Sequence, residues 1–301
     1  MCVNCKRQVD VLNIQWYPGH MTKTRRQIEA DLKLVDLVAE VIDARIPSAS
    51  RNPDIDELVG DKPRLIVLNR ADQADPAMTK LWAKHFRDQG YSVLETDSKS
   101  GAGVKEFSII IKDALKDQIA RWRAKGQVGR PVRVMVVGVP NVGKSTFINK
   151  VAKKKSAKAQ DRPGVTRGKQ WVAVDTGLDL LDTPGILWPK FEDQTVGKKL
   201  AFTGAIKDEI MDAEGLACDL MELLAARYPQ ALTERYKFTP QNDMQGWQLL
   251  EAAGRKRGFL ISGGEVDTER MAKVLLDEFR GGKLGRFTLD VPEGETGRDQ
   301  G

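Results

Sequence analysis

A glycine-rich segment in the middle of the chain has the residue types and spacing of a loop that binds phosphate groups. The segment GVPNVGKS, residues 138–145, follows the apolar run RVMVV and precedes a segment of helical character. In such a loop, backbone N–H groups and a helix N-terminus hold the β-phosphate, the lysine contacts the β- and γ-phosphates, and the serine binds Mg²⁺. The predicted nucleotide contacts are Pro140, Asn141, Val142, Gly143, Lys144, Ser145 and Thr146. A glycine-rich turn without a ligand is the alternative.

Two later segments supply what a metal and a γ-phosphate require. DTPG begins at Asp182, after the apolar run 178–181, and its carboxylate can hold Mg²⁺ through water. The N–H of Gly185 can contact a γ-phosphate and lose that contact after hydrolysis. Thr166, in RPGVTRG, can bind the metal and the γ-phosphate from a mobile loop. Each segment alone would be an ordinary turn or loop, so the prediction depends on all three occurring together.

A guanine-reading element is predicted at LNRAD, which ends an apolar run. Asparagine, two residues and then aspartate is the pattern with which GTP-binding folds read guanine, here Asn69 and Asp72. Asp72 would accept hydrogen bonds from the guanine N1–H and N2–H₂ groups, and adenine would leave this carboxylate unpaired. In TDSKSG, Ser98 and the backbone of Lys99 would contact the guanine O6.

The guanine-reading element precedes the phosphate loop in the sequence, which inverts the usual order. A sheet is assembled in space, so both elements only have to reach one nucleotide. A GTPase sheet that is cut between DTPG and the guanine-reading element, and rejoined elsewhere, gives the order LNRAD, TDSKSG, phosphate loop. The sequence therefore predicts a circular permutation.

Alternating strand-like and helix-like segments must position these residues. Apolar runs predict strands at 37–43, 64–69, 91–96 and 133–138, and a hairpin at 169–175 and 178–181. Helical spacing predicts helices at 29–36, 76–89 and 104–122. This alternation predicts a P-loop α/β fold with a mainly parallel sheet and helices on both faces.

The pattern changes after about residue 195, where amphipathic helical segments follow one another without strands. We predict a GTPase domain with an N-terminal extension at 1–194 and an all-helical, RNA-facing domain at 195–291. The segment 292–301, PEGETGRDQG, is too polar to pack and is predicted to be disordered.

Seven segments in this order resemble the RbgA (YlqF) family of circularly permuted GTPases, which are bacterial assembly factors of the large ribosomal subunit. They are WYPGHMTKTRRQI, EVIDARIPSASRNP, LNRAD, GVPNVGKST, RPGVTRG, DTPGI and LAFTGAIKDEI. The resemblance implies a GTP-hydrolysing switch that uses GTP or GDP and Mg²⁺ and that the immature 50S subunit stimulates. One departure is Arg70, where the family more often has lysine, although the arginine stem can still cover the base.

The resemblance also implies roles that the residues alone do not. Ile186 follows Gly185, where Ras-like enzymes have the glutamine that orients water. The family places a histidine in this role, which here is His20, although such a histidine could be a surface or packing residue. Asn141 matches an asparagine that holds K⁺ in related GTPases. The predicted catalytic residues are His20, Lys144, Thr166 and Gly185, and the predicted metal ligands are Ser145, Thr166 and Asp182.

The charge of the chain favours a polyanionic partner. It has 48 Lys and Arg against 42 Asp and Glu, a net charge of +6 and a pI of about 9.1. Basic residues cluster at 22–26, 121–133, 153–158 and 255–257. Any one cluster could be a solvated face. With the resemblance, we expect several to contact ribosomal RNA, and the scarcity of nearby aromatic residues favours folded RNA.

Cysteine content and hydropathy point to the cytoplasm. Three cysteines are too few for a disulfide scaffold, Cys2 and Cys5 lack the rest of a zinc site, and no apolar run reaches about 18 residues. We expect a monomer that contacts ribosomal RNA and ribosomal proteins but no membrane. Two other functions fit parts of the pattern: a P-loop ATPase or small-molecule kinase, and an RNA-binding assembly chaperone with a vestigial GTPase.

Overall fold

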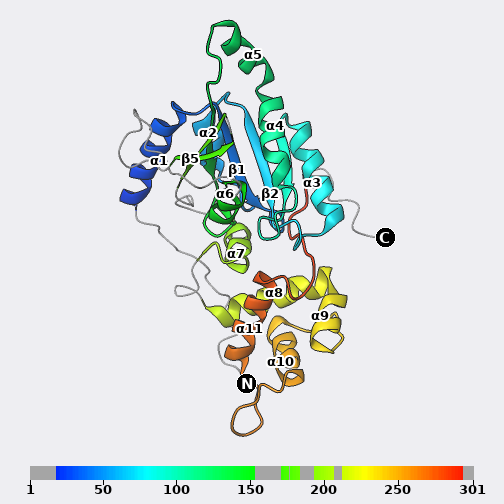
Figure 1. The fold of residues 1–301 in the computed structure, drawn as a ribbon. Coiled ribbons are helices and arrows are strands. Elements are labelled where there is room, and N and C mark those ends of the chain that lie inside the picture. Colours follow the sequence, from blue (N-terminus) through cyan, green and yellow to red (C-terminus); the bar gives the residue numbers. More distant parts are fainter. Residues whose placement is uncertain (1–17, 153–170, 176, 184–192, 207–211, 294–301) are drawn as a thin grey trace. The chain divides into compact units, whose positions relative to one another are not determined.

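The computed structural model describes residues 18–152, 171–175, 177–183, 193–206 and 212–293 (Figure 1). The chain forms two compact units. One unit contains Trp16–Lys190 together with Thr288–Gly301, and the other contains Phe191–Phe287. In the described residues, no helix has the length and apolar character needed to cross a lipid bilayer.

The first unit is built around a six-stranded sheet with the strand order β3-β2-β1-β4-β6-β5. The strands are β1 (Leu37–Asp43), β2 (Arg64–Asn69), β3 (Ser92–Thr96), β4 (Val132–Val137), β5 (Trp171–Asp175) and β6 (Leu178–Asp182). All neighbouring pairs are parallel except β5 and β6, which form the predicted hairpin. The prediction of a mainly parallel sheet is therefore confirmed.

Helices cover both faces of this sheet, because every residue of β1 and β2 is buried. On one face, α1 (Pro18–Leu32) and α2 (Pro53–Val59) pack over one apolar cluster, and α3 (Pro76–Asp88) packs over a second. The other face is covered by α4 (Phe107–Ala114) and α6 (Lys144–Ala152), whose rings Phe107 and Phe147 meet edge to face at 5.1 Å. The predicted layering is thus present.

The predicted helix at 104–122 is divided in the structure. A short 3₁₀ turn, η1 (Val104–Glu106), leads into α4, and α5 (Lys116–Ala124) follows after Leu115, which has φ −109° and ψ 13°. Phe107 and Ile111 of α4 are buried, whereas α5 buries no residue. Figure 1 shows α5 at the top, beyond the end of the sheet. The helix changes direction where the sheet no longer supports it.

The second unit is helical. It contains α7 (Gln194–Phe202), α8 (Ala213–Arg227), α9 (Pro229–Tyr236), α10 (Gly246–Lys256) and α11 (Thr268–Arg280). Aspartates cap the N-termini of three of these helices, namely Asp193, Asp212 and Asp267. Helices α10 and α11 both pack against α8, so the predicted amphipathic helices share one core.

The chain returns to the first unit after α11. Thr288, Leu289 and Asp290 are buried, and the Leu289 N–H donates a 2.7 Å hydrogen bond to the carbonyl of Arg45. The predicted helical domain ran through residue 291, whereas the structure assigns residues from 288 onward to the sheet unit. The backbone hydrogen bond to the loop after β1 accounts for this difference. The spacing of apolar residues in the helices could not predict this contact.

Candidate nucleotide site

The predicted site elements gather at the carboxyl ends of the parallel strands. LNRAD begins in the last two residues of β2, the Ser98 loop follows β3, the phosphate loop follows β4, and Asp182 ends β6. Because β2, β1, β4 and β6 are neighbours in the sheet, these loops lie along one edge. Ligands of open α/β sheets bind at this edge.

Asn69 joins the guanine-reading element to the phosphate loop. Its side-chain NH₂ donates a 2.7 Å hydrogen bond to the carbonyl of Val142. Its side-chain oxygen accepts hydrogen bonds from the Ser98 hydroxyl at 2.6 Å and from the Ser98 N–H at 3.2 Å. Asn69 is 2% exposed. The two elements therefore meet in space despite their inverted order, and Asn69 links both loops.

Arg70 makes a second connection between the same two elements. Its backbone has φ 61°, and its guanidinium donates a 2.6 Å hydrogen bond to the carbonyl of Asn141, which has φ 59°. The Nε atom of Arg70 also lies 3.7 Å from the Asp43 carboxylate. Burial lowers the pKa of Arg70 below its ordinary value, and the carboxylates of Asp43 and Asp72 oppose this lowering.

A buried ion pair supports Arg70 from the end of β1. The Asp43 carboxylate accepts hydrogen bonds from the Arg45 guanidinium at 2.9 and 2.7 Å, and both side chains are 1% exposed. Burial raises the pKa of Asp43, but the Arg45 charge and its hydrogen bonds bring the pKa below its ordinary value. Sequence reasoning missed this pair as a site component, although two charged residues directly after an apolar strand were a visible signal.

Lys144 lies inside the phosphate loop. It is 7% exposed, and its ammonium group donates 3.1 Å hydrogen bonds to the carbonyls of Gly138 and Val139. Burial lowers the pKa of Lys144 to about 8, and the nearby Asp182 carboxylate opposes this change. At Gly138, with φ 149°, a Cβ atom would lie 2.3 Å from the Val41 carbonyl, so the loop requires glycine there.

Asp182 lies beside the phosphate loop, because it pairs with Val136 of β4 and the loop follows β4. Burial raises the pKa of Asp182, while Lys144 lowers it. The next residue, Thr183, donates a 2.6 Å hydrogen bond from its hydroxyl to the Val136 carbonyl, which fixes the end of β6 against β4. Ser145 and Thr146 are exposed in the first turn of α6. An exposed hydroxyl and a nearby carboxylate are oxygen ligands of the kind that Mg²⁺ prefers.

Other predicted contacts have specific partners in the structure. The Lys99 N–H, predicted to meet the guanine O6, donates a 2.8 Å hydrogen bond to the Asp97 carboxylate. The Val142 side chain is buried, so only its backbone can face a ligand. Pro140 is half-buried.

Three predicted catalytic residues are not placed by the structure. Thr166 and Gly185 lie outside the described residues, and the side chain of His20 does as well, although its backbone belongs to α1. The roles of these residues remain predictions.

Comparison with known proteins finds chains that are similar in sequence and in fold. A family profile described as a 50S ribosome-binding GTPase matches residues 133–241. Ribosome biogenesis GTPase A of Priestia megaterium is 49% identical over 284 residues, which cover 93% of this chain and 98% of that protein. A GDP-bound YlqF structure matches 89% of this chain and 100% of its own, with 31% identity and a TM-score of 0.67. The structure of GNP-bound YlqF from T. maritima matches 90% of this chain and 99% of its own, with 31% identity and a TM-score of 0.61. The similarity therefore extends far beyond the phosphate loop.

Proposed function

The chain belongs to the ribosome biogenesis GTPase A family, and from this premise we propose that it hydrolyses GTP as a switch during late assembly of the large ribosomal subunit. The observation that carries the proposal is the hydrogen bond from Asn69 to Val142, because it brings the guanine-reading element and the phosphate loop to one site. Binding of GTP orders the loops around Thr166 and Gly185. Hydrolysis releases the protein from the subunit in the cytoplasm.

Each end of the nucleotide has its own residues in this proposal. Asp72 accepts hydrogen bonds from guanine, and Lys144 exchanges its two loop carbonyls for phosphate oxygens. Ser145, Asp182 and Thr166 would hold Mg²⁺, and Asn141 would hold K⁺. A bound Mg²⁺ would neutralise charge on the β- and γ-phosphate oxygens. The position of Asp182 beside Lys144 supports its assignment to this end.

The choice of guanine over adenine separates this proposal from a P-loop ATPase or kinase. Competition of GDP and ADP for a fluorescent GDP analogue tests it directly. We expect GDP to displace the analogue and ADP to fail at the same concentration, because adenine leaves the Asp72 carboxylate unpaired. Tight binding of ADP would contradict the guanine assignment.

The immature large subunit is the proposed partner and activator, through ribosomal RNA and ribosomal proteins. The net charge of +6 and the basic clusters support contact with RNA. Co-sedimentation with large subunits in a GTP analogue and in GDP tests the partner. GTP turnover with and without these subunits tests the activation. Equal turnover would favour an RNA-binding chaperone with a vestigial GTPase.

His20 is the proposed group that orients the attacking water. Replacing it with alanine should remove the stimulated turnover and leave nucleotide affinity unchanged, because a positioned acid or base contributes about 10²- to 10⁴-fold to a rate. Equal stimulation in His20→Ala and the wild type would remove this assignment.

A further inference from the structure

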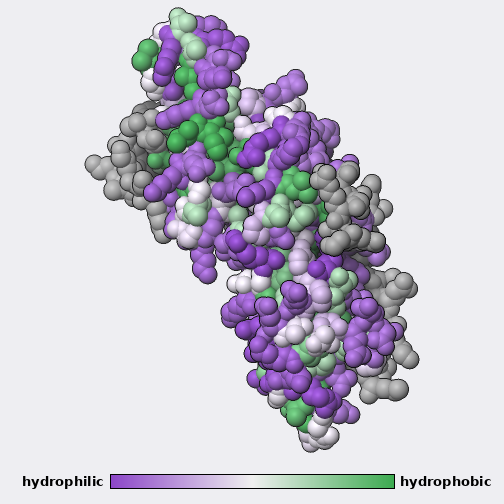
Figure 2. All heavy atoms as spheres, turned by 90° about the vertical axis from the view of Figure 1, so that its right-hand side faces the viewer, coloured by the Kyte–Doolittle hydropathy of each residue, from purple (hydrophilic) through white to green (hydrophobic). Residues whose placement is uncertain are grey.

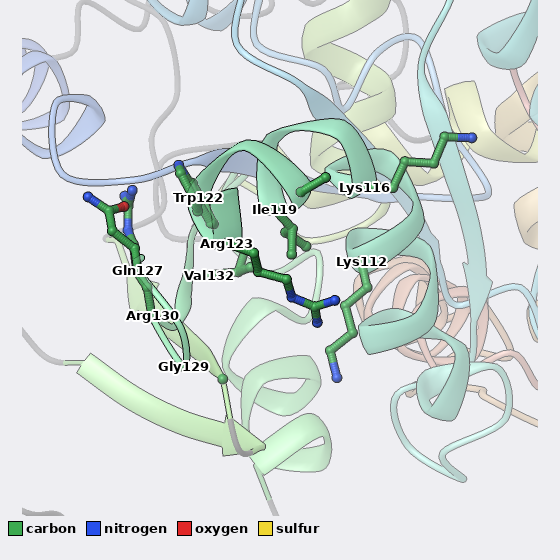
Figure 3. Close-up of a pocket in the computed structure, with 11 residues that line it drawn as sticks. Lys112, Lys116, Ile119, Trp122, Arg123, Gln127, Gly129, Arg130 and Val132 are labelled. Carbon is green, nitrogen blue, oxygen red and sulfur yellow. The ribbon is translucent and has the colours of Figure 1, made fainter. Parts of the chain in front are cut away.

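A groove of about 700 Å³ lies far from the nucleotide site. It is formed by α4, α5, the loop after α5 and the first residue of β4, Val132 (Figure 3). Gly177, directly before β6, also lines it. The phosphate loop follows the other end of β4, and a six-residue strand spans about 20 Å. The groove is therefore at the opposite edge of the sheet and is a separate site.

The groove has a strongly basic lining. Lys112, Lys116, Arg123 and Arg130 are among the described residues that line it, and none of these lining residues is acidic. Figure 3 shows Lys112 and Arg123 extending into the same opening. Over residues 112–133 the sequence has seven lysines and arginines against two aspartates. A concave surface lined by one sign of charge concentrates the field and attracts ions of the opposite sign.

One wall of the groove is held in place by Arg130. Its guanidinium lies 3.9 Å from the centre of the Trp122 ring and donates a 2.9 Å hydrogen bond to the Asp36 carboxylate. The second Asp36 oxygen accepts a 2.9 Å hydrogen bond from the Arg133 N–H at the start of β4. The loop after α5 is thus tied to both the helix and the sheet. A preorganised surface loses less entropy when it binds a partner.

The lining also indicates which nucleic acid fits. Single strands are usually bound by stacking bases on exposed aromatic rings. Trp122 is the aromatic residue among the described lining residues, and Arg130 covers its ring. Duplex RNA is instead recognised mostly through its backbone and shape. In Figure 2 the top of the molecule, where Figure 1 places α5, carries hydrophilic side chains beside a few hydrophobic ones, which suits a polar, hydrated contact.

We propose that this groove binds the phosphate backbone of double-stranded RNA, with Lys112, Lys116 and Arg123 as the phosphate ligands and Arg130 as the fixed wall. The assignment of the RNA to the ribosome rests on the proposed function, but binding to duplex RNA does not. An acidic protein segment is the competing partner. It is disfavoured because Arg130 covers the ring of Trp122, the aromatic lining residue that could otherwise anchor a side chain of a protein partner.

The test measures binding of the full chain to a short fluorescent RNA duplex by anisotropy over a series of KCl concentrations. The groove variant carries Lys112→Ala, Lys116→Ala and Arg123→Ala. The control carries Lys80→Ala, Lys84→Ala and Arg87→Ala, three exposed bases on α3. We expect the groove variant to lose about tenfold or more in affinity. The slope of its log affinity against log salt concentration should become less negative by about 2 to 3. The control should bind like the wild type.

Several outcomes would overturn the proposal. These are wild-type affinity in the groove variant, an equal loss in the control, tighter binding of single strands than of duplexes, or displacement of the duplex by an acidic peptide at equal charge. Affinity for fluorescent GDP and the thermal unfolding midpoint should be unchanged in both variants, which excludes a folding defect. If the wild type binds duplex RNA but does not sediment with large subunits, the groove assignment stands and the ribosomal partner is wrong.

Discussion

A Cβ atom at Gly143 would lie 2.4 Å from the side-chain nitrogen of Asn69. Gly143 also has φ 96°, so both the backbone and the neighbour require glycine here. Asn69 therefore reaches Val142 only because the adjacent residue has no side chain. The phosphate loop and the guanine-reading element are fitted to each other, so a substitution in one should alter the geometry of the other.

Replacing Asn69 should weaken nucleotide binding, because Asn69 links the two loops of the site. Asn69→Ala leaves the Val142 carbonyl and the Ser98 hydroxyl without a buried partner, at a cost of about 1 to 3 kcal/mol each. We expect affinity for fluorescent GDP to fall by about tenfold to a hundredfold and the unfolding midpoint to decrease. Asn69→Asp keeps the acceptor but loses the donor to Val142, and should lose a comparable amount. Asn149→Ala, at an exposed asparagine of α6, is the matched control. Normal GDP affinity in Asn69→Ala would contradict the role of this link.

Asp72→Asn should change which base is preferred. The carboxylate would accept from guanine N1–H and N2–H₂, whereas an asparagine offers one acceptor and one NH₂ donor. Xanthine has a carbonyl where guanine has its amino group, so the variant should bind XDP more tightly than GDP. We expect GDP affinity to fall by about 10² or more, since the asparagine NH₂ would face a donor group of guanine. Competition titrations of GDP and XDP measure the change. An unchanged preference for GDP would show that Asp72 does not contact the base.

Nucleotide binding should become weaker as the pH rises through the pKa of Lys144. Burial holds this pKa at about 8, below its ordinary 10.5. Bound phosphates favour the charged amine, so binding raises the pKa and takes up a proton wherever the free protein is partly neutral. At pH 8 the uptake should be about half a proton per nucleotide.

Calorimetry of GDP binding in two buffers with different ionisation enthalpies measures this uptake. The slope of the observed enthalpy against the buffer enthalpy gives the number of protons. Lys150, a half-buried lysine of α6, offers the control Lys150→Ala, which should keep the same slope. A slope of zero at pH 8 in the wild type would mean that Lys144 is fully charged in the free protein.

The sequence predicted most of the architecture, because the spacing of apolar residues in each segment shows which side of it is buried. The strands at 37–43 and 64–69 match β1 and β2. The circularly permuted GTPase fold and the family are also confirmed by the similarity to YlqF and to ribosome biogenesis GTPase A. This spacing does not show which other segments an element packs against. The helix predicted at 104–122 divides at Leu115, because periodicity does not show where the sheet ends.

The site was predicted as a set of residue types, and the structure adds how they support each other. The motif indicated Asn69 as a ligand contact, and the structure adds the hydrogen bonds that join it to Val142 and Ser98. The charges of Asp43 and Arg45 were visible in the sequence, but their link to Arg70 was not, because Arg70 is distant in sequence. Hydrogen-bond networks depend on three-dimensional neighbours, and one sequence carries little information about them.

The segment after α11 should stabilise the guanine-reading side of the sheet unit. The Asp290 carboxylate accepts a 2.9 Å hydrogen bond from the Ala49 N–H, and its carbonyl accepts one from the Trp82 indole at 3.2 Å. The Thr288 hydroxyl accepts from the Asp75 N–H at 3.2 Å, three residues after Asp72. The segment thus ties the loop after β1 to the start of α3, and both flank the guanine-reading element.

Asp290→Ala would leave the Ala49 N–H buried without its partner, so the free energy of unfolding should fall by about 1 to 3 kcal/mol. Urea denaturation monitored by tryptophan fluorescence measures this loss. GDP affinity should also fall, but by less than in Asn69→Ala, because residues 288–290 act on the guanine-reading element only through the loop after β1 and the start of α3. Glu293→Ala, at an exposed acidic residue of the same segment, should change neither quantity. Equal free energies of unfolding in the two variants would mean that the contacts of residues 288–290 do not stabilise the sheet unit.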